Sequence, residues 1–229
     1  MIEFKNVSKI YFSGGKPFYA LKNVSFKIEK NEFVSIIGKS GAGKTTIVKL
    51  IIGQEKPDEG EILFQGVNIN NLDSKVLQNL RRKIGVVHQD YKLLPTKTVK
   101  ENVEYIMEII GASQEEIERD VPQVLEIVNL ENKMNSFPSE LSGGEKQRLA
   151  IARALIHQPD LIIADEPSGN LDIYNTLEII EIFKRIHSLG KTIILLTHNK
   201  DVVDNLKKRV ITLDAGKIIS DDLEGKYIL

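Results

Sequence analysis

The chain has 229 residues, of which 41% are hydrophobic and 28% charged, a length and composition suited to a globular domain with a buried core. Its formal net charge of -1 gives no argument for an anionic membrane surface or for nucleic acid, and we expect no nucleic-acid partner. The absence of cysteine excludes disulfide bonds and thiol chemistry. No apolar run approaches the roughly 18 residues of a transmembrane helix, and no signal-peptide pattern opens the chain. We therefore expect a cytoplasmic protein that reaches a membrane only through a partner.

The first third of the chain alternates in short steps bounded by Gly, Asn or Pro, which is typical of strands. It predicts an antiparallel layer built from residues 2–7, 21–28 and 61–64. A continuous apolar strand over residues 32–37 ends at Gly38, and a helix follows over residues 45–52. In the middle third, apolar residues at helical spacing predict helices over residues 101–110 and 115–128, the second interrupted by Pro122.

The last third returns to near-continuous apolar strands separated by helices, which predicts a parallel sheet covered on both faces. The expected strands are residues 161–165, 192–197 and 209–213, and the expected helices are residues 174–188 and 200–206. The predicted fold class is therefore α/β with an N-terminal antiparallel layer. We expect a single domain over residues 1–229, with a helical subdomain at roughly residues 91–157 inserted in the α/β core.

Residues 38–45 read GKSGAGKT and match the phosphate-loop pattern G-x-x-x-x-G-K-[ST] between a buried strand and a helix. Glycines let the backbone N–H groups surround a phosphate, and the helix N-terminus adds partial positive charge. Lys44 is expected to reach the β- and γ-phosphates of ATP, and the Thr45 hydroxyl to ligate Mg²⁺. The alternative is a glycine-rich turn with an accidental lysine. The expected ATP-binding residues of this segment are Gly38, Lys39, Ser40, Gly41, Ala42, Gly43, Lys44, Thr45 and Thr46.

The strand over residues 161–165 ends in two carboxylates, Asp165 and Glu166. Open α/β sheets bind ligands at the carboxyl ends of their strands, so Asp165 is expected to hold Mg²⁺ directly or through water. Glu166 is the candidate general base for the water that attacks the γ-phosphate. Two solvated acids at a strand end are the alternative, and the phosphate loop favours the catalytic interpretation.

Residues 141–145 read LSGGE, and Ser142 can cap a helix whose backbone N–H groups emerge after two glycines, a second anion site. Together with the phosphate loop, this segment closely resembles the signature of the ABC ATPase family, and the resemblance covers essentially the whole chain. It implies a P-loop NTPase (RecA-like) core and a head-to-tail homodimer that forms on ATP. In that dimer, one subunit covers the ATP of the other with Ser142, Gly143, Gly144 and Glu145.

The resemblance implies further site residues. Tyr11 stands where the family stacks an aromatic ring on adenine, although a strand-end tyrosine can also belong to the core. Gln89 stands at the Q-loop, which senses Mg²⁺ and the attacking water and contacts a membrane partner. His198 follows a strand end and matches the switch histidine that contacts the γ-phosphate, although a lone histidine is usually structural. Residues 168–172 resemble the D-loop, which crosses the dimer interface and includes Asp172 as an expected nucleotide contact.

These assignments define the expected catalytic and metal-binding sets. The expected catalytic residues are Lys44, Gln89, Glu166 and His198. The expected Mg²⁺ ligands are Thr45, Gln89 and Asp165. Intact Glu166 and His198 argue against a non-enzymatic scaffold, since a pure ATP clamp could lose either.

Two stretches, residues 89–103 and 208–227, resemble the FtsE group of bacterial cell-division ATPases. That resemblance implies an integral membrane partner of the FtsX type, reached through the Q-loop cleft, and a location at the cytoplasmic face of the cell membrane. The ATPase cycle would then drive a conformational change that controls cell-wall hydrolysis during division. The alternative is the ATPase subunit of a lipoprotein-releasing or macrolide-type exporter, which shares most of the Q-loop region.

Overall fold

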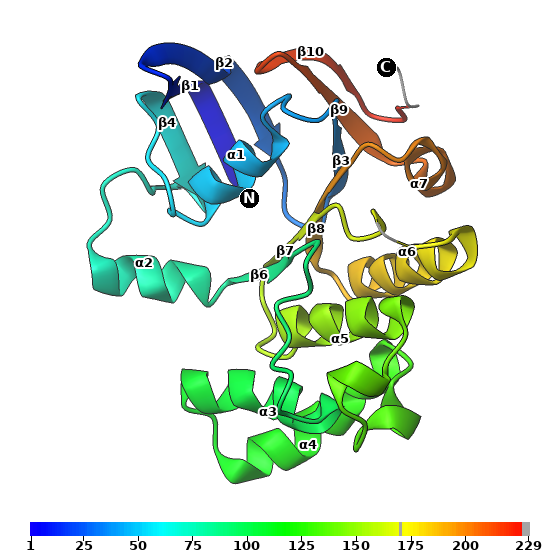
Figure 1. The fold of residues 1–229 in the computed structure, drawn as a ribbon. Coiled ribbons are helices and arrows are strands. Elements are labelled where there is room, and N and C mark those ends of the chain that lie inside the picture. Colours follow the sequence, from blue (N-terminus) through cyan, green and yellow to red (C-terminus); the bar gives the residue numbers. More distant parts are fainter. Residues whose placement is uncertain (170, 226–229) are drawn as a thin grey trace. The chain divides into compact units, whose positions relative to one another are not determined.

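The computed structural model describes residues 1–169 and 171–225 (Figure 1). Asn170 of the expected D-loop and the last two residues of the 208–227 stretch lie outside the described residues. The chain forms two compact units: residues 1–81 with the part from residue 192 onward, and residues 82–191. We call them the first and the second unit and describe each by itself. None of the helices in the described part of the chain is long and apolar enough to cross a membrane.

The first unit contains an antiparallel sheet with the strand order β2-β1-β4-β5. Its strands are β1 (Ile2–Ser13), β2 (Lys16–Ile28), β4 (Glu59–Phe64) and β5 (Val67–Asn68). The sheet confirms the predicted antiparallel layer, but β1 and β2 run much further than residues 2–7 and 21–28. The β1–β2 register contains several irregularities, and Asn6 and Asn23 adopt φ values of 49° and 50°. Such bulges break the two-residue alternation of buried and exposed side chains. The sequence pattern therefore does not predict the full length of β1 and β2.

The first unit also holds a mixed set of strands in the order β10-β9-β3-β8. These are β3 (Phe33–Ile37), β8 (Thr192–Thr197), β9 (Arg209–Asp214) and β10 (Lys217–Asp222), with helices α1 (Lys44–Ile51), α2 (Ser74–Arg81) and α7 (Lys200–Leu206). Strand β3 pairs in parallel with both β8 and β9, while β10 is antiparallel to β9. The sequence does not predict β10 or α2, because β10 is mostly exposed and α2 buries only Leu80.

The second unit combines a parallel strand pair with most of the helical residues. The strands are β6 (Ile84–Val87) and β7 (Leu161–Asp165), and the α-helices are α3 (Val99–Ile110), α4 (Gln114–Ile127), α5 (Gly143–Leu155) and α6 (Ile173–Ser188). Two short 3₁₀ turns, Glu131–Lys133 and Pro138–Glu140, lie between α4 and α5. Thr98, Ser113 and Ser142 each form a capping box at a helix N-terminus, which explains where α3, α4 and α5 begin.

Pro122 does not interrupt α4, contrary to the expectation from the sequence. A proline inside a helix costs roughly 3 kcal/mol, because it removes one backbone hydrogen bond and crowds the preceding turn. The neighbouring apolar face is well packed: Val121 and Leu125 are fully buried, and Ile117 is nearly so. We infer that burial of this face outweighs the cost, since each buried apolar side chain contributes about 1.5–3 kcal/mol.

Gly85 of β6 packs against the end of α5. A Cβ atom at this position would stand 2.1 Å from the carbonyl oxygen of Ala154, which is backbone and cannot move aside as a flexible side chain would. Gly85→Ala is therefore expected to lower the free energy of unfolding by about 3 kcal/mol. The thermal midpoint should fall by about 6–12 °C, measured by calorimetry. Gly143→Ala is the matched control, because its nearest contact is an ordinary 3.5 Å; equal midpoints for the two variants would contradict the close packing of β6 on α5.

Candidate functional site

The phosphate loop joins the buried strand β3 to the N-terminus of α1. Gly41 and Gly43 adopt φ values of 80° and 110°, a region that favours glycine. A Cβ atom at Gly43 would also stand 2.4 Å from the carbonyl oxygen of Ala20. Among the described residues, no side chain caps α1 and its first turn holds no acidic residue. The backbone N–H groups at this helix start therefore meet no built-in anion, and the loop fits a bound phosphate.

Lys44 is buried, and its ammonium group donates to the carbonyl oxygens of Gly38 at 2.6 Å and Lys39 at 3.4 Å. These bonds hold the lysine against its own loop. The remaining predicted residues differ in exposure: Lys39, Ser40, Gly41 and Thr45 are exposed, Gly43 is partly buried, and Gly38, Ala42 and Thr46 are buried. Thr45, the expected Mg²⁺ ligand of this unit, is thus on the accessible side of α1.

His198 lies beside the phosphate loop within the first unit. Strands β3 and β8 are parallel neighbours, and Ile37 pairs with Thr197, so Gly38 and His198 leave the same end of adjacent strands. The following residue, Asn199, caps α7 by accepting from the N–H groups of Asp201 and Val202. Its own N–H donates to the Thr197 hydroxyl at 3.0 Å. The exposed imidazole of His198 therefore lies on a short turn whose backbone is held by these hydrogen bonds.

The second unit brings Gln89, Asp165 and Glu166 to one end of a parallel strand pair, where Val87 pairs with Ala164. Glu166 adopts a φ of 51°, an uncommon conformation for a side-chain-bearing residue and one that tends to occur at functional sites. Its carbonyl oxygen accepts from the N–H of Gly169 at 3.1 Å, which stabilises the turn. The Gln89 amide reaches the same turn, since a Cβ atom at Gly169 would be 3.2 Å from the Gln89 Nε2.

The signature segment opens helix α5. The Ser142 hydroxyl accepts from the Glu145 N–H at 3.3 Å, and the Glu145 carboxylate accepts from the Ser142 N–H at 2.8 Å. The latter bond is the main reason why the pKa of Glu145 lies below its usual value. The box uses the N–H groups of Ser142 and Glu145 and does not involve those of Gly143, which is exposed, and Gly144, which is buried. This geometry supports the second anion site that the sequence predicts.

Helix α6 packs directly against the signature. Asp172 caps α6 and accepts both from the backbone N–H and from the side-chain amide of Asn175, at 2.9 and 2.7 Å. A Cβ atom on Gly144 would stand 1.9 Å from Asn175 Oδ1, so any larger residue there would have to displace the Asn175 side chain. Sequence reasoning did not find Asn175; its position three residues after a helix-capping aspartate was the available signal.

Tyr11 lies near the end of β1 in a partly buried position. Its ring is 5.9 Å from that of Phe18, centroid to centroid, and the Lys9 ammonium lies 5.5 Å from the ring centroid. The Tyr11 hydroxyl is buried and has no hydrogen-bond partner among the described residues. These contacts do not distinguish a Tyr11 ring that stacks on adenine from one that belongs to the core. Stacking on adenine therefore stays a prediction.

The segment after Gln89 is held by two side chains whose role the sequence did not reveal. Asn102 is fully buried; it accepts from the Leu94 N–H and donates to the carbonyl oxygens of Leu94, Lys97 and Thr98. Arg153 of α5 donates to the carbonyl oxygen of Lys92. An asparagine at an otherwise apolar helix position was the only signal in the sequence.

The described residues contain no cluster of three or more His, Cys, Asp or Glu side chains that could hold a metal. This finding is compatible with Mg²⁺, which commonly binds through one or two carboxylates and takes its remaining ligands from substrate phosphates and water. Thr45 belongs to the first unit, whereas Asp165 and Gln89 belong to the second. Hydroxyl, amide and carboxylate oxygens are each ligands of the type that a hard cation such as Mg²⁺ prefers.

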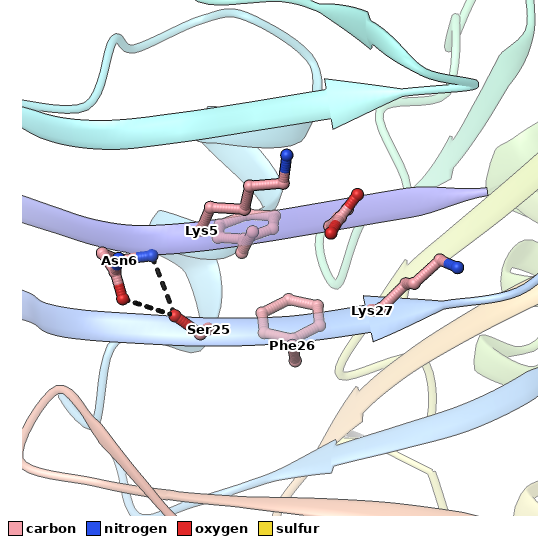
Figure 2. A pocket seen from close by; sticks show the side chains of 7 residues that line it. Lys5, Asn6, Ser25, Phe26 and Lys27 are labelled. Carbon is pink, nitrogen blue, oxygen red and sulfur yellow. Dashed lines mark hydrogen bonds between the residues drawn. The ribbon is translucent and has the colours of Figure 1, made fainter.

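A separate hollow of about 410 Å³ lies on the first unit, between β1 and β2 (Figure 2). Its floor includes the stacked rings of Phe4 and Phe26, with centroids 4.5 Å apart. The Ser25 hydroxyl donates to Asn6 Oδ1 and accepts from the Asn6 N–H, as the dashed lines show. The two lysines that line the hollow pair with carboxylates, Lys5 with Glu61 and Lys27 with Glu29.

Comparison with known proteins agrees with this geometry. Residues 21–169 match the sequence pattern of the ABC transporter family. The chain is 45% identical over 227 residues to the "Cell division ATP-binding protein FtsE" of Streptococcus pneumoniae, covering 99% of this chain and 97% of that protein. It is 44% identical over 220 residues to "Methionine import ATP-binding protein MetN 1" of Listeria innocua, covering 96% of this chain and 65% of that one.

Among solved structures, the chain resembles the ATP-binding cassette MJ0796 in a dimeric post-hydrolysis state bound to ADP and Pi. The TM-score is 0.88 at 39% identity, over 99% of this chain and 100% of that one. The likeness confirms the predicted fold class, an α/β cassette with an antiparallel layer and parallel strands. Because the family pattern spans more than half of the chain and the relatives match nearly all of it, the chain belongs to the ABC transporter family and is an ABC-type ATPase that hydrolyses ATP to ADP and phosphate.

Proposed function

We propose that the chain hydrolyses MgATP in a composite site formed by two copies arranged head to tail. Lys44 and the N–H groups of residues 41–45 hold the phosphates, and Tyr11 stacks on the adenine. The uncapped start of α1 and the inward-held Lys44 support this assignment. Gly143 and Gly144 of the second copy supply N–H groups to the same nucleotide, together with Ser142 and Glu145. Asp172 lies next to these groups through Asn175. The relative MJ0796 is described as dimeric.

The chemistry is an in-line attack of water on the γ-phosphate. Glu166 accepts a proton from the attacking water, and Gln89, whose amide reaches the Glu166 turn, orients that water. His198 donates to a γ-phosphate oxygen, and Lys44 stabilises the charge that develops on the phosphoryl group. The residues Thr45, Asp165 and Gln89 would hold Mg²⁺. When bound, that ion polarises the β- and γ-phosphates and neutralises their charge.

We further propose a role in cell division, with a membrane partner of the FtsX type and a location at the cytoplasmic face of the membrane through that partner. The observation that carries this proposal is the 45% identity to FtsE of Streptococcus pneumoniae over 97% of that protein. The ATPase cycle then alternates a closed and an open dimer, and the partner passes this motion across the membrane to control cell-wall hydrolysis. The single domain over residues 1–229 with a helical subdomain at 91–157 is part of the same proposal.

Co-purification from the native membrane tests the division role. A tagged chain should carry an FtsX-type membrane protein with it, and depletion of the chain should give filamentous or chained cells. Recovery of a lipoprotein-releasing, macrolide-exporting or methionine-import membrane subunit in place of an FtsX-type protein would overturn the division role. That outcome would leave the ATPase assignment intact.

A further inference from the structure

Lys9 of β1 is a buried cation next to Tyr11, the residue proposed to stack on adenine. Only 9% of Lys9 is exposed. Its ammonium group donates to the carbonyl oxygen of Lys56 at 2.7 Å and lies 3.7 and 3.5 Å from the carboxylates of Glu55 and Asp58. It also lies over the ring of Tyr11, 5.5 Å from the ring centroid. A buried ammonium group loses its hydration, and these polar partners and the electron-rich face of the ring replace it.

The polar partners of Lys9 lie in the segment that follows α1, the helix that begins at the phosphate loop. The N–H groups of Gln54 and Glu55 donate to the carbonyl oxygen of Lys49, in the last turn of α1, at 2.8 and 3.2 Å. These hydrogen bonds hold the segment against the end of the helix. All of these residues belong to the first unit. One buried ammonium group therefore joins the Tyr11 ring to the end of the phosphate-loop helix.

The backbone directly before Tyr11 is irregular. The register between β1 and β2 shifts between Lys9 and Ile10, and such a bulge locally interrupts the hydrogen bonds of a strand pair. Asp58 Oδ2 accepts from the Ile10 N–H at 2.6 Å, so the segment after α1 also holds the backbone at this point. The ring of Phe18, opposite Tyr11 on β2, is tilted by 34° to the Tyr11 ring and is 49% exposed. Lys9 thus supplies a buried contact to the Tyr11 ring, whereas the Phe18 contact is partly open to solvent.

From this geometry we infer that Lys9 is a positioning residue for nucleotide binding, because it fixes the Tyr11 ring relative to the phosphate-loop helix. The inference rests on the proposed stacking of adenine on Tyr11 and adds the group that holds the ring in place. Stacking requires aligned planes, and a ring that is fixed before binding loses less conformational freedom when the base arrives. Lys9 should therefore affect ligands that carry a nucleobase and should not affect a bare polyphosphate.

Isothermal calorimetry of the full chain with two ligands, ATP and inorganic triphosphate, tests this role. Lys9→Met removes the charge and keeps an unbranched side chain. Its ATP affinity should fall about 3- to 30-fold, the range for a cation–π contact that is largely withdrawn from water. Its affinity for inorganic triphosphate, which has no base to stack, should stay within about twofold, as for other changes that leave a ligand's contacts intact. The carboxylates of Glu55 and Asp58 are partly exposed and stay hydrated without Lys9, so the variant should fold, and its thermal midpoint checks this.

Three further variants separate positioning of the ring from a general structural effect. Lys5→Met makes the same chemical change at an exposed lysine of the same strand, which pairs with Glu61 at 3.0 Å, and should leave both affinities unchanged. Lys9→Arg keeps a cation that can lie over an aromatic ring and should retain most of the ATP affinity. Tyr11→Leu should lower the ATP affinity, and adding Lys9→Met to it should lower the affinity little further, since both changes remove one interaction.

The outcomes distinguish this inference from the proposed function. If Tyr11→Leu leaves the ATP affinity unchanged, adenine does not stack on Tyr11, and the role of Lys9 is overturned together with the stacking. If Tyr11→Leu weakens ATP binding but Lys9→Met does not, only the positioning role is overturned. That role is also overturned if Lys9→Met weakens the binding of inorganic triphosphate as much as that of ATP, or lowers the ATP affinity equally with and without the Tyr11 ring. In both of these cases the lysine acts through the fold and not through the ring.

Discussion

Replacing Glu166 by Gln is expected to lower ATP turnover about 10²- to 10⁴-fold while ATP still binds. The amide has nearly the shape of the carboxylate but cannot accept the proton of the attacking water. The groups proposed to bind ATP, Lys44 and the loop N–H groups, lie in another segment and are unchanged. ATP should therefore accumulate in the closed state, and the variant should elute as a dimer on gel filtration with ATP. Steady-state phosphate release and the elution volume measure the two effects.

Glu118→Gln is the matched control for this variant. Glu118 is an exposed carboxylate on α4 that accepts from Gln114, and its replacement makes the same chemical change away from the proposed site. It should retain turnover close to the unmodified chain. If Glu166→Gln hydrolysed ATP at a normal rate, Glu166 would not be the general base. If it stayed monomeric at saturating ATP, the head-to-tail arrangement would be wrong even though the base assignment survived.

Lys44→Ala is expected to weaken ATP binding about 10- to 150-fold, the range for losing a hydrogen bond to a charged group. The ammonium group lies within the loop at 2.6 Å from the Gly38 carbonyl, so it is preorganised to meet a phosphate. Its loss also removes the bonds that fix the loop, and this adds to the effect. Isothermal calorimetry with ATP and with ADP measures the change.

Lys49→Ala provides the comparison for the lysine variant. Lys49 lies in the last turn of the same helix, α1, and its substitution removes the same charge from the opposite end. Its ATP affinity should stay within about twofold of the unmodified chain, since a solvated charge near the surface contributes little. Unchanged ATP affinity in Lys44→Ala would contradict the phosphate-loop assignment, whatever the behaviour of Lys49→Ala.

The sequence predicts the buried strands and the motif-bearing segments well, because both depend on short, contiguous patterns. Strands β3, β7 and β8 are mostly apolar, with no exposed position among the first four of each, and the sequence alone predicts them as strands. The phosphate loop is likewise determined locally, since its glycines and its lysine lie within eight residues of one another. The resemblance to the ABC ATPase family rests on the same short segments.

The misses have a common cause, which is that tertiary contacts overrule the local pattern. Helix α4 continues through Pro122 because its apolar face is packed. Helix propensities of single residues do not include that packing energy, so they do not predict this continuation. Strand β10 forms at an edge, held by pairing with β9, although its own residues are mostly polar. Strands β1 and β2 extend through bulges where alternation fails. In each case the stabilising partner is distant in sequence.

The sequence by itself determined the reactive groups: a phosphate-binding loop with Lys44, two carboxylates after β7, a signature with a capping serine, and Gln89 and His198 at strand ends. Only the tertiary structure decided how these groups are supported. It showed the left-handed Glu166 turn closed by Gly169, the contact of Asn175 with Gly144, and the capture of the Lys92 carbonyl by Arg153. The reason is physical: chemistry follows from side-chain type and local spacing, whereas orientation, strain and burial arise from residues that meet only after the chain has folded.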